Sequence, residues 1–280
     1  MQPGEIQPGS TVELDRCDPN DTSGFTRPER DAQLELQRLR GKLQRLQELL
    51  YAGHQHRVLI VLQGMDTSGK DGTIRRVFEG VNPQSVRVAR FGPPTVPELD
   101  HDFLWRIHPQ VPAKGEIVIF NRSHYEDVLI ARVRKLVPKE TLHHRYREIN
   151  GFERMLVEEG TSILKFYLHI DFREQGRRLR ARLDDPSKHW KFSVSDLIDR
   201  SLWTKYIKAY NEALERTSTE WAPWIVVPAN HKWYRDLTVL RSIVGTLTRF
   251  RMQFPPLAPE ARTFLRGRPW GKGKLPSPVD

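Results

Sequence analysis

The stretch RVLIVLQGMDTSGKDG occupies residues 57–72, and it decides how the chain must fold. Its first part, Arg57–Gln63, contains five consecutive apolar residues, a run of the length of a buried strand. Gly64-x-x-x-x-Gly69-Lys70 follows with the spacing of a Walker A phosphate-binding loop, and a helix can begin at Lys70. A strand, a glycine-rich loop and a helix in this order predict a phosphate-binding loop rather than a turn that binds nothing.

The residue types of this loop explain how it would bind phosphate. Gly64 and Gly69 allow tight turns in which backbone N–H groups point inward at phosphate oxygens. The helix that follows places the positive end of its dipole beneath the same oxygens. Lys70 adds a full positive charge, which can follow a phosphoryl group during its transfer.

Two carboxylates distinguish the loop from most sequences of this kind. Asp71 stands where a Ser or Thr usually binds magnesium, and Asp66 lies inside the loop itself. A carboxylate among phosphates is repelled unless a magnesium ion lies between them. We therefore predict that Asp66 and Asp71 organise a metal ion or act as a base on the acceptor. Gly72 and Thr73 follow directly and are expected to contact phosphate.

The rest of the chain alternates apolar runs with helical segments. Further strands are predicted at 85–91, 116–120, 162–170 and 224–227. Helices are predicted at 29–52, 70–79, 96–108, 123–135, 139–159, 171–183, 193–216 and 232–252. Strands that are apolar throughout and separated by helices indicate a parallel sheet covered on both faces. The predicted fold class is therefore a three-layer α/β domain at residues 29–253.

The two ends of the chain differ from this domain in composition. Residues 1–28 are rich in Pro, Gly, Asp, Thr and Ser and are expected to form an irregular N-terminal arm. Residues 254–280 are dominated by Pro, Gly and basic residues and are expected to form a mobile basic tail. Leucines recur along one face of the helix at 29–52, at Leu36, Leu39, Leu43, Leu46 and Leu50. We interpret this face as packing on the core, with a contact in a homo-oligomer as the alternative.

The predicted strand at 116–120 ends in the sequence NRSHYED at residues 121–127. A P-loop fold usually carries the Walker B carboxylate here, and Asn121 is a weaker, neutral ligand. Arg122 is expected to face the phosphates, because its planar fork binds two oxygens at once. Glu126 and Asp127 follow one helical turn later. Both have a structural alternative, since Ser123-x-x-Glu126 fits a capping box and acidic residues stabilise a helix start.

Five arginines fall within residues 173–182, and Arg178 and Arg182 lie one turn apart. Pro186 is expected to end this helix, which leaves Lys188 and Lys191 on a short loop beside aromatic residues. A basic helix and loop after a late strand is typical of the lid of a nucleoside kinase, which closes over phosphates and supplies arginines. We therefore predict a lid at about residues 171–196, with a solvated basic surface as the alternative.

The composition sets outer limits on function. The chain has 280 residues and a net charge of +10, which favours polyanionic partners such as nucleic acid, anionic lipid or polyphosphate. Cys17 is the only cysteine, which excludes an intramolecular disulfide and fits a reducing cytosol. No apolar window reaches the length of a membrane span, and residues 1–10 lack the apolar segment of a secretory signal. We expect a cytoplasmic protein without a membrane partner.

Three motifs, in this order and spacing, resemble the polyphosphate kinase 2 family. They are Gly64-x-Asp66-x-x-Gly69-Lys70-Asp71-Gly72, Asn121-Arg122-Ser123-x-Tyr125-Glu126-Asp127 and Asp185-Pro186-x-Lys188-x-Trp190-Lys191-Phe192. The likeness extends over roughly residues 30–252. The second motif looks like the class III branch, whose members resemble one another in phosphorylating both AMP and ADP. Many other members carry aspartate where this chain has Asn121, which leaves the metal arrangement open.

The resemblance implies a thymidylate-kinase-like P-loop kinase fold that moves phosphoryl groups reversibly between polyphosphate and adenine, or also guanine, nucleotides. It implies Mg²⁺ as cofactor, with Mn²⁺ tolerated. The expected catalytic residues are Asp66, Lys70, Arg122 and Arg182. The expected metal ligands are Asp66, Asp71 and Glu126. The expected phosphate and nucleotide ligands are Gly64, Gly69, Asp71, Gly72, Thr73, Asn121, Glu126, Asp127, Arg178, Lys188 and Lys191.

Two other functions compete with this interpretation. An ATP-dependent nucleoside monophosphate kinase would share the loop and the lid. A nucleic-acid-binding ATPase would use the charge of +10 on a nucleic-acid backbone, but the sequence shows no known nucleic-acid module, so no nucleic-acid partner is expected. A homo-oligomer is expected from the leucine-lined helix. Glu126 is hypothesised to influence the choice between monophosphate and diphosphate acceptors.

Overall fold

The computed structural model describes residues 4–259 and 261, and within this part five strands form one parallel sheet in the order β2-β3-β1-β4-β5. The strands are β1 (Arg57–Gln63), β2 (Val86–Arg90), β3 (Ile117–Asn121), β4 (Thr161–His169) and β5 (Trp224–Pro228). All five strands predicted from the sequence are confirmed. β1 pairs with β3 on one side and β4 on the other, so the strand that leads into the glycine-rich loop lies at the centre of the sheet.

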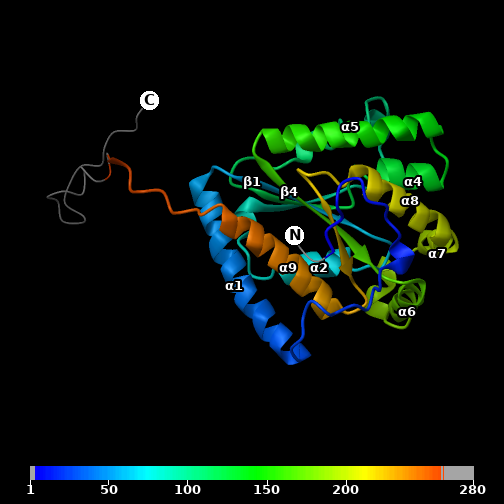
Figure 1. Ribbon diagram of the computed structural model, residues 1–280, viewed down its shortest axis with the longest axis horizontal. Coiled ribbons are helices and arrows are strands. Elements are labelled where there is room, and N and C mark those ends of the chain that lie inside the picture. Colours follow the sequence, from blue (N-terminus) through cyan, green and yellow to red (C-terminus); the bar gives the residue numbers. More distant parts are fainter. Residues whose placement is uncertain (1–3, 260, 262–280) are drawn as a thin grey trace.

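Side chains alternate along β1 and divide the core into two layers. Leu59 and Val61 belong to one apolar cluster, and Val58 and Ile60 belong to the other. The helices over the first layer are α4 (Glu126–Val133), α5 (Lys139–Glu158) and α8 (Trp203–Thr217). Those over the second are α1 (Glu29–Gly53), α2 (Lys70–Val77) and α9 (Lys232–Arg249). Figure 1 shows the two sets on opposite sides of the sheet, which confirms the three-layer fold.

The leucine-lined face of α1 packs on the core. Leu36, Leu43 and Leu50 are buried in the second layer, and α1 lies against α9. The sequence-based interpretation of this helix as a core helix is therefore confirmed.

The N-terminal segment, residues 4–28, runs along the domain. The Ile6 N–H donates to the Trp224 carbonyl at 2.8 Å, so the chain here pairs with the outer edge of β5. Leu14 is fully buried in the first core layer, and Phe25 is buried in the second. The segment is largely irregular, yet its apolar side chains contribute to both layers.

The helix predicted at 96–108 is mostly absent. Only α3 (Val96–Leu99) is helical, and a short 3-10 helix, η3 (His108–Gln110), follows after turns. The Asp102 carboxylate accepts a hydrogen bond from the Leu104 N–H at 2.9 Å. A local bond of this kind competes with the backbone pattern of a helix, which explains the turns.

The helix predicted at 193–216 is two helices. α7 (Val194–Ser201) ends before Leu202, and α8 begins at Trp203. The chain turns at Leu202, and both apolar side chains at the break pack against the core. The sequence pattern did not show this break because the helical spacing continues through it.

The helix predicted at 123–135 begins three residues later, as α4. Arg122 has a φ of 62°, and the Ser123 hydroxyl accepts from the Tyr125 N–H at 3.2 Å, so residues 122–125 form a turn ahead of the helix. No side chain caps the first turn of α4. The capping-box interpretation of Ser123 and Glu126 is therefore wrong.

The basic segment follows β4. It consists of α6 (Phe172–Leu183), the 3-10 helix η4 (Pro186–Lys191) and α7, and α6 ends before Pro186, as predicted. Figure 1 shows α6 and α7 together at one end of the sheet. None of the helices in the described ranges is both long and apolar enough to cross a membrane.

Leu14→Ala is expected to lower the free energy of unfolding by about 2–4 kcal/mol, because it deletes buried methyl groups and leaves a cavity. Denaturant unfolding would measure this change. Arg16→Ala is the matched control, since its side chain is 82% exposed, and should alter stability by less than about 0.5 kcal/mol. Equal stability of the two variants would show that the N-terminal segment contributes nothing to the core.

Candidate active site

The loop after β1 brings the N-terminus of α2 to the carboxyl edge of the sheet. Gly64 has a φ of 150° and Gly69 a φ of 105°, values that residues other than glycine rarely adopt. Gly69 is the N-cap of α2. The Arg122 N–H donates to the Leu62 carbonyl at 3.2 Å, so the residue after β3 lies beside the start of this loop. The strand, loop and helix thus form the phosphate-binding geometry expected from the sequence.

Two buried arginines hold the loop from outside. Arg178, on α6, donates to the carbonyls of Thr67 and Ser68 at 2.9 and 3.0 Å. Arg235, on α9, donates to the Ser68 carbonyl at 3.1 Å. In a trans peptide unit the C=O group and the N–H group that follows it point in opposite directions, so carbonyls bound on the outer side favour amides that face inward.

Arg178 therefore does not lie where the sequence placed it. Its guanidinium also donates to the carbonyls of Ala229 and Asn230 and pairs with Glu174 at 2.6 Å. All of its hydrogen-bonding directions are taken up by protein groups, so it supports the loop and does not line the cavity.

Asp236 connects the loop to α9 by a second set of contacts. It accepts from Arg235 at 2.9 Å and from the Thr73 hydroxyl at 3.2 Å, and it pairs with Arg76. Thr73 was expected to contact phosphate. Its hydroxyl is instead directed to Asp236, beneath the loop.

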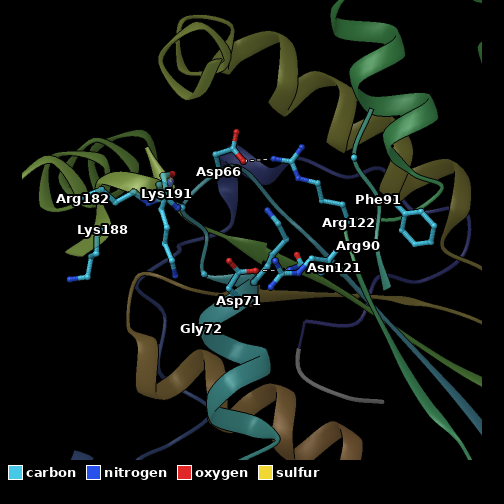
Figure 2. A pocket seen from close by; sticks show the side chains of 14 residues that line it. Asp66, Asp71, Gly72, Arg90, Phe91, Asn121, Arg122, Arg182, Lys188 and Lys191 are labelled. Atoms are coloured by element: carbon cyan, nitrogen blue, oxygen red, sulfur yellow. Dashed lines mark hydrogen bonds and ion pairs between the residues drawn. The ribbon is translucent and has the colours of Figure 1, made fainter. Parts of the chain in front are cut away.

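A cavity of about 450 Å³ lies above the loop. Six basic side chains and two carboxylates line it, and Figure 2 shows them on both walls, with Arg182, Lys188 and Lys191 opposite Asn121 and Arg122. Ten of the fifteen predicted site residues line the cavity, namely Asp66, Gly69, Lys70, Asp71, Gly72, Asn121, Arg122, Arg182, Lys188 and Lys191. The five that do not are Gly64, Thr73, Glu126, Asp127 and Arg178.

Lys70 is folded back onto the loop. Its Nζ donates to the Gly64 carbonyl at 2.6 Å and to the Met65 carbonyl at 3.3 Å. Burial, and to a lesser extent the neighbouring Arg122, lowers the pKa of Lys70 to about 8, with Asp66 partly offsetting both effects. An anion above the loop would favour the charged lysine and raise its pKa again.

The two cavity carboxylates each have a partner from the end of β3. Asp66 accepts from Arg122 at 2.6 Å, and Asp71 accepts from Asn121 at 2.6 Å, as the dashed lines in Figure 2 show. Arg122 reaches Asp66 from a left-handed backbone conformation, which costs on the order of 1 kcal/mol in a residue other than glycine. These contacts pair the loop with the second motif of the sequence.

Glu126 lies behind Arg122 and not in the cavity wall. Its Oε2 is 4.0 Å from an Arg122 Nη, and burial raises the pKa of Glu126, although Arg122 and Lys70 oppose the shift. The carboxylate therefore adds negative charge beside the guanidinium from the protein side.

Asp127 is also outside the cavity, and it supports the wall. It pairs with Arg106 at 3.3 Å and with Arg145 at 4.0 Å, and Arg106 donates to the Gly92 carbonyl at 2.9 Å. Burial raises the pKa of Asp127, and Arg106 opposes this shift. Asp127 thus acts on the segment after β2 through Arg106.

The basic side chains of the segment formed by α6, η4 and α7 are partly neutralised within it. Arg182 donates to Asp196 at 3.1 Å and to the Lys191 carbonyl at 2.9 Å. Lys188 pairs with Asp185 at 2.5 Å. These contacts orient Arg182 toward the cavity mouth while leaving Lys188 and Lys191 on the lining.

β2 contributes to the cavity in a way that was not predicted from the sequence. Arg90, Phe91 and Gly92 line the cavity at the carboxyl end of this strand, and Phe91 packs against Phe120 with ring centroids 4.9 Å apart. The signal was present, since parallel strands bring their carboxyl ends to the same edge of a sheet. Applied to the strand predicted at 85–91, that rule identifies Arg90.

The acidic residues fit a metal ion that is shared with substrate, not a metal held by protein alone. Asp66 and Asp71 line the cavity, but Glu126 does not join them. Over the ranges that the structure describes, no three His, Cys, Asp or Glu side chains are grouped to hold a metal ion. Magnesium in kinases usually takes one or two carboxylates and completes its shell with water and phosphate oxygens, which suits two carboxylates beside a phosphate-binding loop.

A phosphate-binding loop, a cavity of converging cations and two carboxylates define a P-loop phosphotransferase, since this chemistry needs alignment and charge neutralisation more than a nucleophile from the protein. The profile of the family described as polyphosphate kinase 2 matches residues 27–255. The chain belongs to the polyphosphate kinase 2 family. Phosphotransferases of this kind work with a divalent metal ion.

Curated relatives and a solved structure extend this match over nearly the whole chain. The AMP/ADP-polyphosphate phosphotransferase of Meiothermus ruber is 57% identical over 255 residues, which is 91% of this chain and 96% of the relative. The ADP-polyphosphate phosphotransferase of Rhodopseudomonas palustris is 44% identical over 233 residues, or 79% and 81% of the two chains. The crystal structure of polyphosphate kinase 2 from Arthrobacter aurescens TC1 has a TM-score of 0.88 and 43% identity, covering 93% of this chain and 94% of that one.

Gly69→Ala is expected to lower the free energy of unfolding by about 1–3 kcal/mol and to abolish phosphate binding. An added Cβ would lie 1.9 Å from the buried Arg235 Nη1, and the φ of 105° disfavours any side chain. Denaturant unfolding and calorimetric titration would measure the two effects. Gly41→Ala on α1 is the control, because nothing lies within 4 Å of its added Cβ, and it should leave binding unchanged. Equal behaviour of the two variants would contradict the requirement for glycine in the loop.

Polyphosphate binding is expected to take up protons near pH 8. With a pKa of about 8, Lys70 is about half neutral at that pH, and a bound polyanion restores its charge, so uptake should approach about half a proton. Affinity should therefore fall as the pH rises through 8. Calorimetric titration in buffers of different ionisation enthalpy measures the uptake. Lys70→Arg, whose guanidinium stays charged, is the control and should show none of this component; uptake that persists in it would assign the effect to another group.

Proposed function

We propose that this protein transfers the terminal phosphoryl group of inorganic polyphosphate to AMP and to ADP, in a reversible reaction. The observation that carries the proposal is the cavity above the phosphate-binding loop, where six basic side chains face two carboxylates. A linear chain of phosphates is the kind of ligand that such an excess of positive charge attracts. The printed names of the relatives from Meiothermus ruber and Rhodopseudomonas palustris support the same donor and the same acceptors.

The positions of the cations suggest how the transfer proceeds. The terminal phosphate of the polymer lies over the loop, and the terminal phosphate of the nucleotide approaches it in line. The anhydride P–O bond breaks, a polymer one unit shorter leaves, and a nucleotide oxygen forms the new bond. Lys70, at the end of the loop, stabilises the equatorial oxygens of the moving group. Arg122 and Arg182 do the same from the two walls (Figure 2). A strong base is unnecessary, because the nucleotide phosphate is already anionic.

The proposed cofactor is Mg²⁺, with Mn²⁺ as a tolerated substitute. Asp66 and Asp71 are the residues that would hold it, together with phosphate oxygens. Bound there, the ion would neutralise charge on donor and acceptor. Glu126 lies on the protein side of Arg122, where its carboxylate acts on the charge of the guanidinium. We propose that it influences the choice between AMP and ADP in this way.

Residues 171–196 are proposed to act as the lid of a domain that spans 29–253. They carry Arg182, Lys188 and Lys191 over the cavity, and closure would exclude water, which otherwise competes with the nucleotide for the phosphoryl group. Guanine acceptors, a homo-oligomer and a cytoplasmic location stay predictions from the sequence. So does the mobile tail at 254–280, of which 260 and 262–280 lie outside the described residues.

The decisive experiment mixes purified protein, Mg²⁺, a polyphosphate of defined length and AMP or ADP, without ATP, and follows products by phosphorus NMR. Formation of ADP from AMP, and of ATP from ADP, is expected. Lys70→Ala should lower the rate by at least about 10²-fold, since it removes the charge beneath the moving group. Lys42→Ala, on the exposed surface of α1, is the matched control and should keep the wild-type rate.

Two outcomes would contradict the proposal. Product that forms from AMP only after ATP is added would identify an ATP-dependent nucleoside monophosphate kinase. Hydrolysis of ATP that DNA stimulates, with no transfer from polyphosphate, would identify a nucleic-acid-binding ATPase.

A further inference from the structure

A charged cluster lies wholly inside the protein, in the layer between the sheet and α5. The side chains of Lys165 on β4 and Glu153 on α5 are both 0% exposed, and they pair at 2.6 Å. The Tyr125 hydroxyl donates to Glu153 at 2.7 Å and accepts from Lys165 at 3.0 Å. Lys165 also donates to the Thr217 carbonyl at 2.7 Å, and His124 Nε2 lies 3.2 Å from Glu153. None of these side chains reaches the cavity.

A buried cluster of this kind is not explained by its contribution to stability alone. Taking a lysine and a glutamate out of water carries a desolvation cost that their attraction often fails to recover, and an apolar pair of similar volume is frequently as stable. A fully satisfied buried network does, however, fix its members in one arrangement.

Tyr125 links the cluster to the candidate active site. It lies three residues after Arg122 along the chain, and the intervening Ser123 and His124 are both fully buried. The Ser123 hydroxyl accepts from the Tyr125 N–H at 3.2 Å, so the turn between Arg122 and Tyr125 is closed by its own contacts. A tether on the Tyr125 ring therefore fixes the backbone of the whole turn.

Arg122 is the residue in that turn that needs a tether. Its φ of 62° is unfavourable for a side-chain-bearing residue, and in this conformation its guanidinium meets Asp66 at 2.6 Å above the loop. Backbone strain persists only where the surroundings over-determine it. The contacts of Tyr125 with Glu153 and Lys165 supply such a restraint at the other end of the turn.

We propose that Glu153 and Lys165 are positioning residues for phosphoryl transfer, which act by clamping the Tyr125 hydroxyl and thereby hold Arg122 in its strained conformation over the phosphate-binding loop. The inference rests on the proposed function only in that Arg122 contacts the moving phosphoryl group. It assigns a functional reason to a buried ion pair that no substrate can touch.

A double-mutant cycle on kcat tests whether Tyr125 acts through Arg122. Tyr125→Phe removes only the clamped hydroxyl, and it should lower kcat about tenfold while KM for polyphosphate and AMP changes less than about twofold. In an Arg122→Lys background, where the guanidinium fork is already absent, the same substitution should change kcat by less than about twofold. A tenfold loss in both backgrounds, or no loss in the wild-type background, would overturn the proposal.

Tyr167→Phe is the matched control for this cycle. Tyr167 is fully buried on β4, and its hydroxyl has no hydrogen-bond partner among the described residues, so its removal should leave kcat unchanged. Wild-type turnover of AMP and polyphosphate in the same assay shows whether the proposed function holds, independently of the cycle.

A paired replacement separates positioning from folding. Glu153→Leu together with Lys165→Met removes both charges and leaves apolar side chains of similar length, so the protein should stay folded, with a melting temperature lowered only by the lost hydrogen bonds of Tyr125 and His124. Its kcat should nevertheless fall about tenfold, as in Tyr125→Phe, because the hydroxyl has lost its clamp. A folded double variant with wild-type kcat would show that the cluster has no role beyond structure.

Discussion

The site depends on the orientation of two carbonyl groups. The carbonyls of Thr67 and Ser68 must point away from the cavity if the amides of the loop are to face a phosphate, and Arg178 and Arg235 bind them from the outer side. Because both guanidinium groups are buried, their charges are met by Glu174 and Asp236, which tie the loop to α6 and α9. The loop geometry is therefore a property of the tertiary structure and not of its glycines alone.

Several cations of the cavity already have partners within the protein before any substrate arrives. Lys70 binds the Gly64 carbonyl, Arg122 binds Asp66, and Arg182 binds Asp196. A polyanion that binds must therefore replace these internal partners, which keeps its affinity moderate. In return, the basic side chains are already ordered before it binds. The transition state of phosphoryl transfer is stabilised best by charges that are already oriented. The free energy of orienting these side chains is then spent during folding and not during the reaction.

Patterns that are local in sequence predicted most of the fold and about two thirds of the candidate site. The apolar run before Gly64 identified the central strand, and the loop spacing identified Lys70. Contacts between distant segments were beyond reach, because helical spacing cannot say that Arg178 faces the loop carbonyls or that Thr73 meets Asp236. Asp127 and Glu126 were identified as important, but their partners, Arg106 and Arg122, place both of them behind the cavity wall. Lys165 lies within the mostly apolar strand β4, and nothing in the local sequence indicated that its charge is paired with Glu153.

The two edges of the sheet are shielded by different means, and this bears on how the protein behaves at high concentration. At β5, the backbone of Gly4 and Ile6 occupies the strand's outer hydrogen-bonding groups. At β2, the other edge, the strand carries Arg87 and Arg90, whose charges discourage a second sheet from docking. Loss of residues 4–6 would thus uncover an apolar edge, Trp224–Val227, and convert the enzyme into a template for aggregation without touching its chemistry.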